Sequence, residues 1–465
     1  MSNEEAENRL DKLRSQINRG TFSSSNIKAR ERERLVFIAK LGKDAWNLWF
    51  QEHPPEKTLD FSGADFCRER INFSGFIFKR PIDGSPCVDF TDAQLKEANK
   101  FKGSRFETKA IFTRTTTGNS CSFKGAIFEG DAEFKNSNFG ENTNFERSTF
   151  EGNADFSEAQ FDKDTNFNDS KFCSRAKYNS TIFGKSTRFN NCRFEEAADF
   201  SQASFGNLTE FKITNFFGES NFDQTTFGIR CSFEKASFHD EASFLNTEFQ
   251  GGADFKESCF SDALFDNAEF TGIALFISTK FSGLSLFRKS LFHTEASFEE
   301  SEFQSDVIFT SARFNGPTSF DRSIFNGTTT FKGTSHQSST SFEFSKFHRV
   351  TDFSITSDIS KSDKNDPLDF NIISFAGAHF QSDVTFEGRK FKSKTDFGRS
   401  KGLRTGSIAT TFDGIPNFHG CDLHQDTDFN GTIFNEDFDA DRGPDAARAY
   451  RTLKLAMEKV KATRE

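Results

Sequence analysis

The chain has 465 residues and a formal net charge of −10, and it contains 66 phenylalanines but only two tyrosines and two tryptophans. Acidic and basic residues are interspersed, so direct nucleic acid binding is disfavoured, because phosphate contacts need a basic face. No apolar run approaches the length of a membrane span, and the N-terminus does not resemble a signal peptide, so we expect a cytoplasmic chain with reduced cysteines.

The first predicted element is a helical segment within residues 1–55. Trp46 and Trp49 are three residues apart and therefore share one face of the expected helix. Pro54 and Pro55 follow shortly afterwards, and a helix is expected to end before them. The two tryptophans are candidates for a capping role or for contact with a partner.

A phenylalanine ladder fills the middle of the chain. From Phe123 to Phe260 the ladder positions are spaced alternately by five and six residues, and Tyr178 fills the one position that is not Phe. The repeating unit therefore has eleven residues. Two residues before most ladder positions lies a small side chain, such as Ala154 or Ser170. Alternating large and small inward side chains are typical of a tightly stacked interior.

The spacing distinguishes among three structures that could carry this repeat. A helix would place the two phenylalanine series on different faces, and the segment is rich in Asn, Asp, Ser, Thr and Gly, which are poor helix formers. A flat strand would turn one of the two series to the opposite face, because one spacing is odd and the other even. A strand that coils and turns a corner after each short segment keeps every ring inside. The sequence therefore predicts a β-solenoid.

The ladder is irregular at three places. Phe260 is followed by Phe265, one residue earlier than the alternation requires, so one extra residue is expected to be missing there. Near 354–374 the expected ladder positions hold charged residues, which would not lie unpaired inside the column, so we expect a protruding loop. A stretch near 398–411 is rich in Gly, Ser and basic residues and is also expected to be an irregular loop. The charged residues of these two stretches are Asp358, Lys364, Asp369, Arg399, Lys401 and Arg404.

A helix is predicted within residues 439–465. Pro444 is at a position that opens helices, and apolar residues then recur every three or four positions in one stripe. Three residues of this stripe are candidates for capping the solenoid or for contact with a partner, and a homo-oligomer formed through this terminal helix is an alternative. The stripe consists of Ala446, Tyr450, Leu453, Met457 and Val460, and the three candidates are Tyr450, Leu453 and Met457.

These patterns resemble the pentapeptide-repeat family. The sequence "ADF" at 64–66, 154–156 and 253–255 is similar to the family motif A(D/N)LXX, with Phe in place of Leu. "AWNLWF" and the following "DFSGADF" resemble the "aWNxWR…P…DLSGADL" start of many bacterial members, although Phe50 stands where Arg is common. The resemblance implies an all-β fold, a right-handed quadrilateral parallel β-helix over residues 56–438, between a helical cap at 1–55 and a C-terminal helix at 439–465. The C-terminal "YRTLK" is similar to a helix that often follows Phe-rich repeats and leads to further helices or membrane segments.

This chain departs from the family pattern by one extra residue in every second repeat. We interpret the extra residue as a bulge at alternate corners or sides, which predicts a coil of twenty-two residues.

We expect no enzyme, no cofactor and no metal site, because the sequence contains no recognised catalytic motif and no zinc-type cysteine pair. "HGCDLHQD" at 419–426 contains residue types that bind metals, but Cys421 should point inwards while His419 and His424 each follow an inward residue, so they should not converge. The predicted function is a non-enzymatic scaffold that acts through a protein partner. Two alternatives are a DNA mimic that binds a topoisomerase or another nucleic-acid-binding protein, and the soluble part of a membrane-linked regulator.

Overall fold

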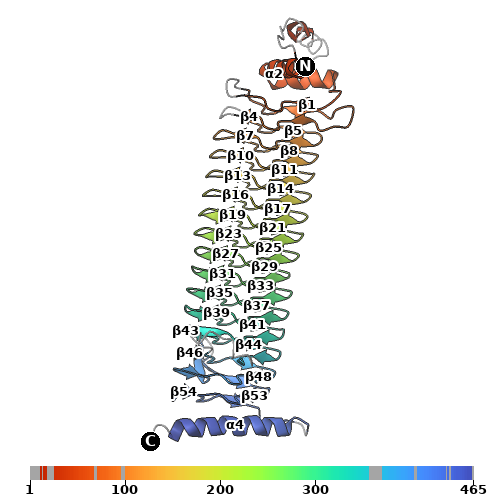
Figure 1. Ribbon diagram of the computed structural model, residues 1–465. Coiled ribbons are helices and arrows are strands. Elements are labelled where there is room, and N and C mark those ends of the chain that lie inside the picture. The colour runs from red at the N-terminus through yellow and green to blue at the C-terminus, as the bar shows by residue number, and fades with distance from the viewer. Residues whose placement is uncertain are drawn as a thin grey trace. The chain divides into compact units, whose positions relative to one another are not determined.

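The computed structural model describes residues 11–12, 14–17, 26–66, 71–95, 100–355, 369–402, 406–435, 437–438 and 441–462. The chain divides into two units, Met1–Asn221 and Phe222–Glu465, and each is described by itself. Both units are built from coils of a right-handed, four-sided parallel β-helix, which confirms the predicted fold class (Figure 1). We number the sides of a coil 1 to 4 in the order in which the chain passes through them.

Helices are found near both ends of the chain. In unit 1, α2 (Ile27–Lys40) begins after Asn26, whose side chain accepts a hydrogen bond from the backbone N–H of Lys28 at 3.0 Å. It is followed by α3 (Lys43–Glu52), which ends just before Pro54. In unit 2, the final element is α4 (Gly443–Ala462), with Pro444 in its first turn.

The coils of unit 1 contain two-residue strands. Side 1 is formed by β1 (Leu59–Asp60), β3 (Val88–Asp89), β6 (Ala110–Ile111), β9 (Ala132–Glu133), β12 (Ala154–Asp155), β15 (Ala176–Lys177), β18 (Ala198–Asp199) and β22 (Ser220–Asn221). Side 2 is formed by β4 (Gln94–Leu95), β7 (Thr116–Thr117), β10 (Asn138–Phe139), β13 (Gln160–Phe161), β16 (Ile182–Phe183) and β19 (Ser204–Phe205). Side 3 has β20 (Thr209–Glu210) and single bridges that connect Ser122, Asn144, Asn166, Arg188 and Glu210. Side 4 is formed by β2 (Ile77–Phe78), β5 (Arg105–Phe106), β8 (Ile127–Phe128), β11 (Thr149–Phe150), β14 (Lys171–Phe172), β17 (Arg193–Phe194) and β21 (Asn215–Phe216).

The coils of unit 2 repeat this arrangement. Side 1 is formed by β26 (Ala242–Ser243), β30 (Ala263–Leu264), β34 (Ser285–Leu286), β38 (Val307–Ile308), β42 (Thr329–Thr330), β45 (Thr351–Asp352), β48 (Val384–Thr385) and β53 (Pro416–Asn417). Side 2 begins with β23 (Thr226–Phe227), β27 (Glu248–Phe249), β31 (Glu269–Phe270), β35 (Leu291–Phe292) and β39 (Arg313–Phe314). Side 3 contains β24 (Cys231–Ser232), β28 (Ala253–Asp254), β32 (Ala274–Leu275), β36 (Ala296–Ser297), β40 (Thr318–Ser319), β49 (Thr395–Asp396) and β54 (Thr427–Asp428).

Two longer strands of unit 2, β43 (Ser335–Ser341) and β46 (Phe370–Ser374), run from side 2 to side 3. Side 4 is formed by β25 (Ser237–Phe238), β29 (Cys259–Phe260), β33 (Lys280–Phe281), β37 (Glu302–Phe303), β41 (Ile324–Phe325), β44 (Lys346–Phe347), β47 (His379–Phe380), β52 (Thr411–Phe412) and β55 (Ile433–Phe434).

The strand register confirms a coil of twenty-two residues. On side 1, Ala132 lies opposite Ala154 and Ala154 opposite Ala176. The five-residue steps of the ladder cross a tight β-turn, such as the turn in which the Ala159 N–H donates to the Phe156 carbonyl at 3.1 Å and Glu158 has φ 57°. The six-residue steps place their extra residue at the other corners. At one of these corners Gly152 is required, because a Cβ there would lie 2.5 Å from the carbonyl carbon of Gly130.

The interior consists of four columns of phenylalanine rings. Phe134 and Phe156, one coil apart on side 1, stack with ring centroids 4.7 Å apart and planes inclined by 3°. Rings of different columns meet edge to face, as Phe145 and Phe156 do at 5.4 Å and 89°. Both geometries are favourable for aromatic pairs, so the ladder fills the core with contacts in two directions.

Small polar residues between the rings satisfy buried backbone groups. The hydroxyl of Ser170 donates to the Phe145 carbonyl at 2.7 Å, and the hydroxyl of Thr181 donates to the Phe156 carbonyl at 2.8 Å. Both hydroxyls are fully buried. A serine or threonine in the small position thus fits the narrow space, and its buried hydroxyl, which would be costly to leave unpaired, finds an acceptor there.

The missing residue after Phe260 shortens one coil without interrupting the columns. Ala242 lies opposite Ala263, twenty-one positions later, and Phe244 stacks on Phe265 at 4.7 Å. The deletion is therefore accommodated at the corner between β29 and β30.

The coil that contains residues 354–374 is longer than the regular coils of twenty-two residues. Phe342 stacks on Phe375 at 5.1 Å and Phe353 stacks on Phe386 at 5.1 Å, so thirty-three positions separate stacked rings. The insertion of eleven residues equals half a coil, which is why the ladder frame survives it. Asp358 and Lys364 lie outside the described residues, and Asp369 pairs with Lys392 at 2.8 Å.

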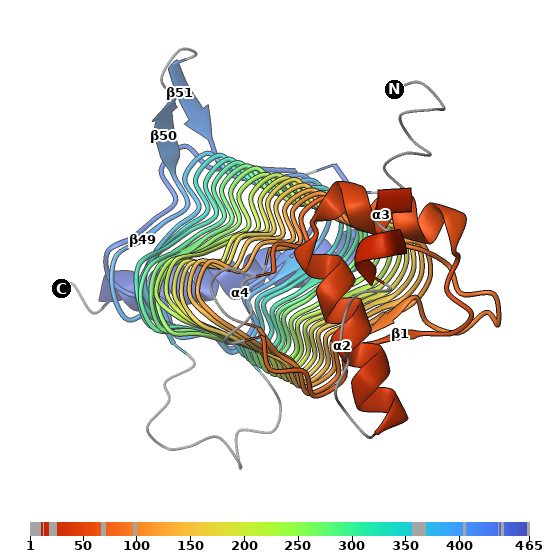
Figure 2. The same ribbon diagram turned by 90° about the horizontal axis from the view of Figure 1, so that it is seen from above.

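The stretch at 398–411 differs from the predicted irregular loop. Its described parts form an antiparallel hairpin of β50 (Arg399–Gly402) and β51 (Gly406–Ala409), which stands away from the neighbouring coils (Figure 2). The Ser400 hydroxyl donates to the Glu343 carboxylate at 3.1 Å and so attaches the hairpin to its unit. Arg404 lies outside the described residues.

Candidate functional site

The buried thiols of the interior are unsuited to catalysis. Cys121, Cys192 and Cys231 occupy the small inward positions and are buried. Burial raises the pKa of Cys121 to about 12 and also raises the pKa of Cys192. Since a thiolate is the reactive form, these side chains act as small apolar fillers rather than nucleophiles.

The residues of the 419–426 stretch point to different partners. The Cys421 thiol donates to the Phe386 carbonyl at 3.0 Å inside the coil, whereas the His424 Nδ1 accepts the backbone N–H of Asp426 at 3.1 Å on the outside. Across the described parts of the chain, no three His, Cys, Asp or Glu side chains converge as metal ligands.

Charged side chains on the outer faces connect neighbouring coils. In unit 1, Arg114 pairs with Asp92 at 2.7 Å and Lys124 pairs with Glu146 at 2.8 Å, each across twenty-two positions. In unit 2, Arg322 pairs with Glu300 at 3.0 Å in the same way. Exposed ion pairs of this kind each contribute little to stability. In each pair, the charge of the acidic group is balanced by a basic group on the neighbouring coil.

At the N-terminal end of unit 1, α3 lies against the first coils. Trp46 is fully buried, and its ring centroid lies 5.1 Å from that of Phe76 and 5.6 Å from that of Phe78. Its indole N–H donates to the Ile77 carbonyl at 3.1 Å. Asn47 donates to the Gly75 carbonyl at 3.0 Å and accepts the Ile77 N–H at 2.8 Å. The Asn47 amide thus pairs with the backbone at β2 as a neighbouring strand would.

Trp49 has different neighbours, although it shares the helical face expected from its spacing. Its ring stacks on His53 at 4.2 Å and 12°, and the Arg34 guanidinium of α2 lies 5.6 Å from its ring centroid. Trp49 is 8% exposed. Trp46 therefore contacts the coils, while Trp49 joins α3 to α2.

At the C-terminal end of unit 2, α4 lies across the last coil. Leu453 is 5% exposed, and the Tyr450 hydroxyl donates to the Asn435 carbonyl at 2.6 Å. An ion pair between Arg442 and Asp383 holds the start of the helix near side 1. Met457 is half-buried on the same face, and the Val460 side chain lies outside the described residues.

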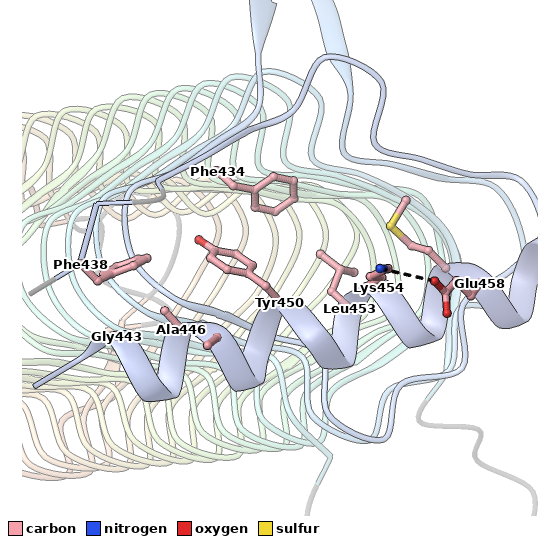
Figure 3. A pocket seen from close by; sticks show the side chains of 10 residues that line it. Phe434, Phe438, Gly443, Ala446, Tyr450, Leu453, Lys454 and Glu458 are labelled. Atoms are coloured by element: carbon pink, nitrogen blue, oxygen red, sulfur yellow. Dashed lines mark ion pairs between the residues drawn. The ribbon is translucent and has the colours of Figure 1, made fainter. Parts of the chain in front are cut away.

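A pocket of about 620 Å³ separates part of α4 from β55 (Figure 3). Phe434 and Tyr450 meet there edge to face at 5.8 Å and 79°. An ion pair of Lys454 and Glu458, 3.8 Å apart, lies at the rim. The sequence-predicted residues that the structure brings together here are Tyr450, Leu453 and Met457, and they are joined by Phe434 and Phe438.

A buried arginine lies in unit 2, in the coil that follows the insertion. Arg389 is fully buried and donates hydrogen bonds to the carbonyls of Phe353, Thr334 and Phe331, the last two at 2.7 Å and 3.0 Å. Its guanidinium also lies 4.6 Å from the ring centroid of Phe370. Burial lowers the pKa of this guanidinium, because the charged form loses contact with water.

The sequence analysis did not predict the contacts that Asn47, Phe434 and Arg389 make. Asn47 had a signal, since it lies between the two tryptophans of the N-terminal motif. Arg389 also had one, because it lies two residues before Phe391, where the repeat places a small side chain. Phe434 is indistinguishable from other ladder residues until the end of the column is known.

Comparison with known proteins identifies the repeat. The family model for pentapeptide repeats (9 copies) matches residues 123–171 and 265–313. The comparison with curated proteins finds no match. Over the described ranges, no helix is both long enough and apolar enough to cross a membrane.

Proposed function

Because the chain is a pentapeptide-repeat protein, we propose that it is a non-enzymatic β-helical scaffold that acts through protein contacts. The observation that supports this proposal most strongly is the filling of the interior. Four columns of stacked rings occupy the space inside the coils, and hydroxyls between them, such as those of Ser170 and Thr181, donate to backbone carbonyls. The outer faces and the chain ends therefore carry the groups that a partner can reach.

The terminal helices have two roles in this proposal. Trp46 and Asn47 of α3 cap the first coils of unit 1, since they cover phenylalanine rings and pair with an exposed strand edge. In unit 2, α4 caps part of the last coil through Leu453 and presents Tyr450 and Met457 at a pocket that is open to a partner.

We also propose a cytoplasmic location. The described cysteines are all free thiols, and Cys259 on an outer face of unit 2 is exposed. Free thiols persist most readily in a reducing compartment.

The test is co-purification of the full-length tagged chain from its source cell, followed by mass spectrometry and by light scattering of the purified material. We expect a stoichiometric protein partner or self-association that survives washing. Cells that carry the tag alone provide the control. A monomeric chain without a stoichiometric partner would contradict the proposal.

DNA mimicry is a second candidate, because side 1 of unit 1 carries an acidic row. The outward residues of this row are Asp60, Asp89, Glu133, Asp155 and Asp199. Mimicry of a duplex needs one continuous acidic face. This row is interrupted by Ile111 and Lys177, and Lys109 pairs with Glu133 at 2.5 Å. The scaffold therefore remains the better supported proposal.

A further inference from the structure

We propose that the pocket between β55 and α4 binds an extended peptide segment of a partner protein. The segment pairs with β55 as one more parallel strand and places a large apolar side chain against Phe434. This inference rests on the proposed scaffold function and specifies the site and the chemistry of the partner.

The open edge of β55 determines which backbone groups the segment must offer. The Ile433 N–H donates to the Thr410 carbonyl and the Asn435 N–H donates to the Phe412 carbonyl, both at 2.9 Å. For a strand added beyond β55, the equivalent acceptors would be the carbonyls of Thr432 and Phe434. No backbone N–H of the described residues donates to either of them. A strand edge with free acceptors favours pairing with another extended backbone.

The ring column ends at the same place. Phe434 stacks on Phe412 at 5.3 Å and 7°, as rings do throughout side 4. On its other side no ring of the described residues continues the stack in parallel, because Tyr450 meets Phe434 edge to face. The pocket of about 620 Å³ lies beside this ring, and its volume is within the usual range for bound ligands (about 300–1,000 Å³).

The lining of the pocket favours an apolar side chain. Phe434, Tyr450, Leu453 and Met457 belong to its wall, and the charged groups of Lys454 and Glu458 pair with each other there (Figure 3). A large apolar side chain would thus meet rings and a thioether inside, while the backbone stays at the strand edge.

The register of side 4 defines the sequence that fits. In β55 a phenylalanine lies between two residues whose backbone N–H groups donate to the preceding coil, namely Ile433 and Asn435. The bound segment therefore needs one large apolar residue between two residues that retain their backbone N–H. A proline at either flanking position would remove a required donor.

The test uses the full chain and a fluorescein-labelled peptide, Gly-Thr-Ile-Phe-Asn, which repeats residues 431–435. Fluorescence anisotropy should show saturable binding of one peptide per chain. A peptide that is N-methylated at its Ile and Asn should bind at least about tenfold more weakly, since both edge hydrogen bonds are lost. Equal binding of the two peptides, or no saturable binding, would overturn the proposal.

Matched variants locate the site on the chain. Phe434→Ala and Met457→Glu should each weaken peptide binding by about tenfold or more, because they remove the apolar wall of the pocket. Leu455→Glu is the control, since Leu455 is 59% exposed on α4 outside the pocket, and it should leave binding unchanged. Met457→Glu keeps the test valid if Phe434→Ala disturbs the last coil. Unchanged binding to both pocket variants would place the peptide elsewhere and overturn the proposal.

Two further outcomes separate this inference from the scaffold proposal. If the wild-type chain binds no peptide but retains a stoichiometric partner, and Met457→Glu retains it too, the scaffold stands and the strand-addition site is wrong. If the peptide binds in this pocket but no stoichiometric partner or self-association is found, the site stands and the scaffold proposal is contradicted. Self-association of the chain that displaces the peptide would show that a second copy occupies the pocket, which overturns the inference as stated.

Discussion

Arg389 takes the place of a hydroxyl in the small inward position. In regular coils a serine or threonine there donates one hydrogen bond to a phenylalanine carbonyl, as Ser345 does to Phe320 at 2.6 Å. Arg389 donates to the carbonyls of Phe353, Thr334 and Phe331. Its longer side chain reaches a second coil, which the half-coil insertion has rearranged. The arginine therefore satisfies acceptors that a hydroxyl could not reach.

We predict that Arg389→Met destabilises the coils on both sides of the insertion by about 2 kcal/mol or more, because the buried carbonyls of Phe353 and Thr334 lose the arginine as their donor. Replacement of a buried charge by an apolar side chain is often tolerated, but here two buried carbonyls lose the hydrogen bonds that the arginine donates, while the Phe331 carbonyl keeps its bonds from Thr334. Native-state hydrogen exchange of the β45 and β48 amides would measure the loss. Ser345→Ala, which removes one bond, should cost about 1 kcal/mol. An equal or smaller effect of Arg389→Met would show that its hydrogen bonds do not matter.

His336 is the second exception at the residue scale. It occupies a ladder position on side 2, stacks on Phe314 at 5.1 Å and hydrogen bonds to Thr334 and Thr340 through its two ring nitrogens at 3.0 Å and 2.9 Å. Burial lowers the pKa of His336, and the nearby positive charge of Arg389 lowers it further. The folded protein therefore holds this imidazole neutral.

We predict that the coil around His336 is weakened by acid. Because the pKa in the folded state is lower than in the unfolded state, stability is intact above the unfolded value of about 6.5 and falls by up to about 1.4 kcal/mol per pH unit below it. Hydrogen exchange of the β43 and β46 amides at neutral and mildly acidic pH would measure this dependence. His336→Phe should remove it and continue the ring column. The same acid dependence in the variant would assign the effect to another group.

At the scale of elements, α3 shows how a helix can protect a strand edge. Trp46 covers the rings, and Asn47 provides a donor and an acceptor at the spacing of a neighbouring strand. The hairpin of β50 and β51 shows the opposite case, because it leaves the coil and is attached through Ser400. The sequence predicted the helix and its end at the prolines, but not the role of Asn47 between the tryptophans.

We predict that Asn47→Leu exposes the backbone at β2 and lowers the stability of the first coils by about 1–3 kcal/mol, since the Gly75 carbonyl and the Ile77 N–H lose their partners. The variant should also self-associate more readily, as open strand edges do. Hydrogen exchange and size-exclusion chromatography with light scattering would measure both effects. Gln51→Leu, on the exposed part of α3, is the control and should change neither.

At the scale of the whole molecule, the ladder spacing predicted the fold because a single residue type defines the interior. The side chains of Phe156 and its equivalents have no polar atom that needs a hydrogen bond. Their spacing in the sequence therefore shows directly which residues point into the interior. The predicted coil of twenty-two residues is confirmed by the register of Ala132, Ala154 and Ala176. The extra residues proved to lie at corners, where Gly152 shows how closely successive coils approach.

The candidate site could be predicted only in part. The apolar stripe of the C-terminal helix correctly grouped Tyr450, Leu453 and Met457 on one face. The pocket itself depends on where the ring column ends relative to that helix, and no local pattern contains this information. Arg389 and its three acceptors lie up to fifty-eight positions apart, so their meeting depends on the insertion within the longer coil.

The half-coil insertion also bears on how such a chain can change in length. Phe375 stacks on Phe342 and Phe386 stacks on Phe353 as though no residues had been added. The eleven added residues equal one repeat unit, so the rings that follow them return to the same columns. Gene segments that encode eleven residues, and not only complete turns, can therefore be gained or lost during evolution while the hydrophobic lining is preserved.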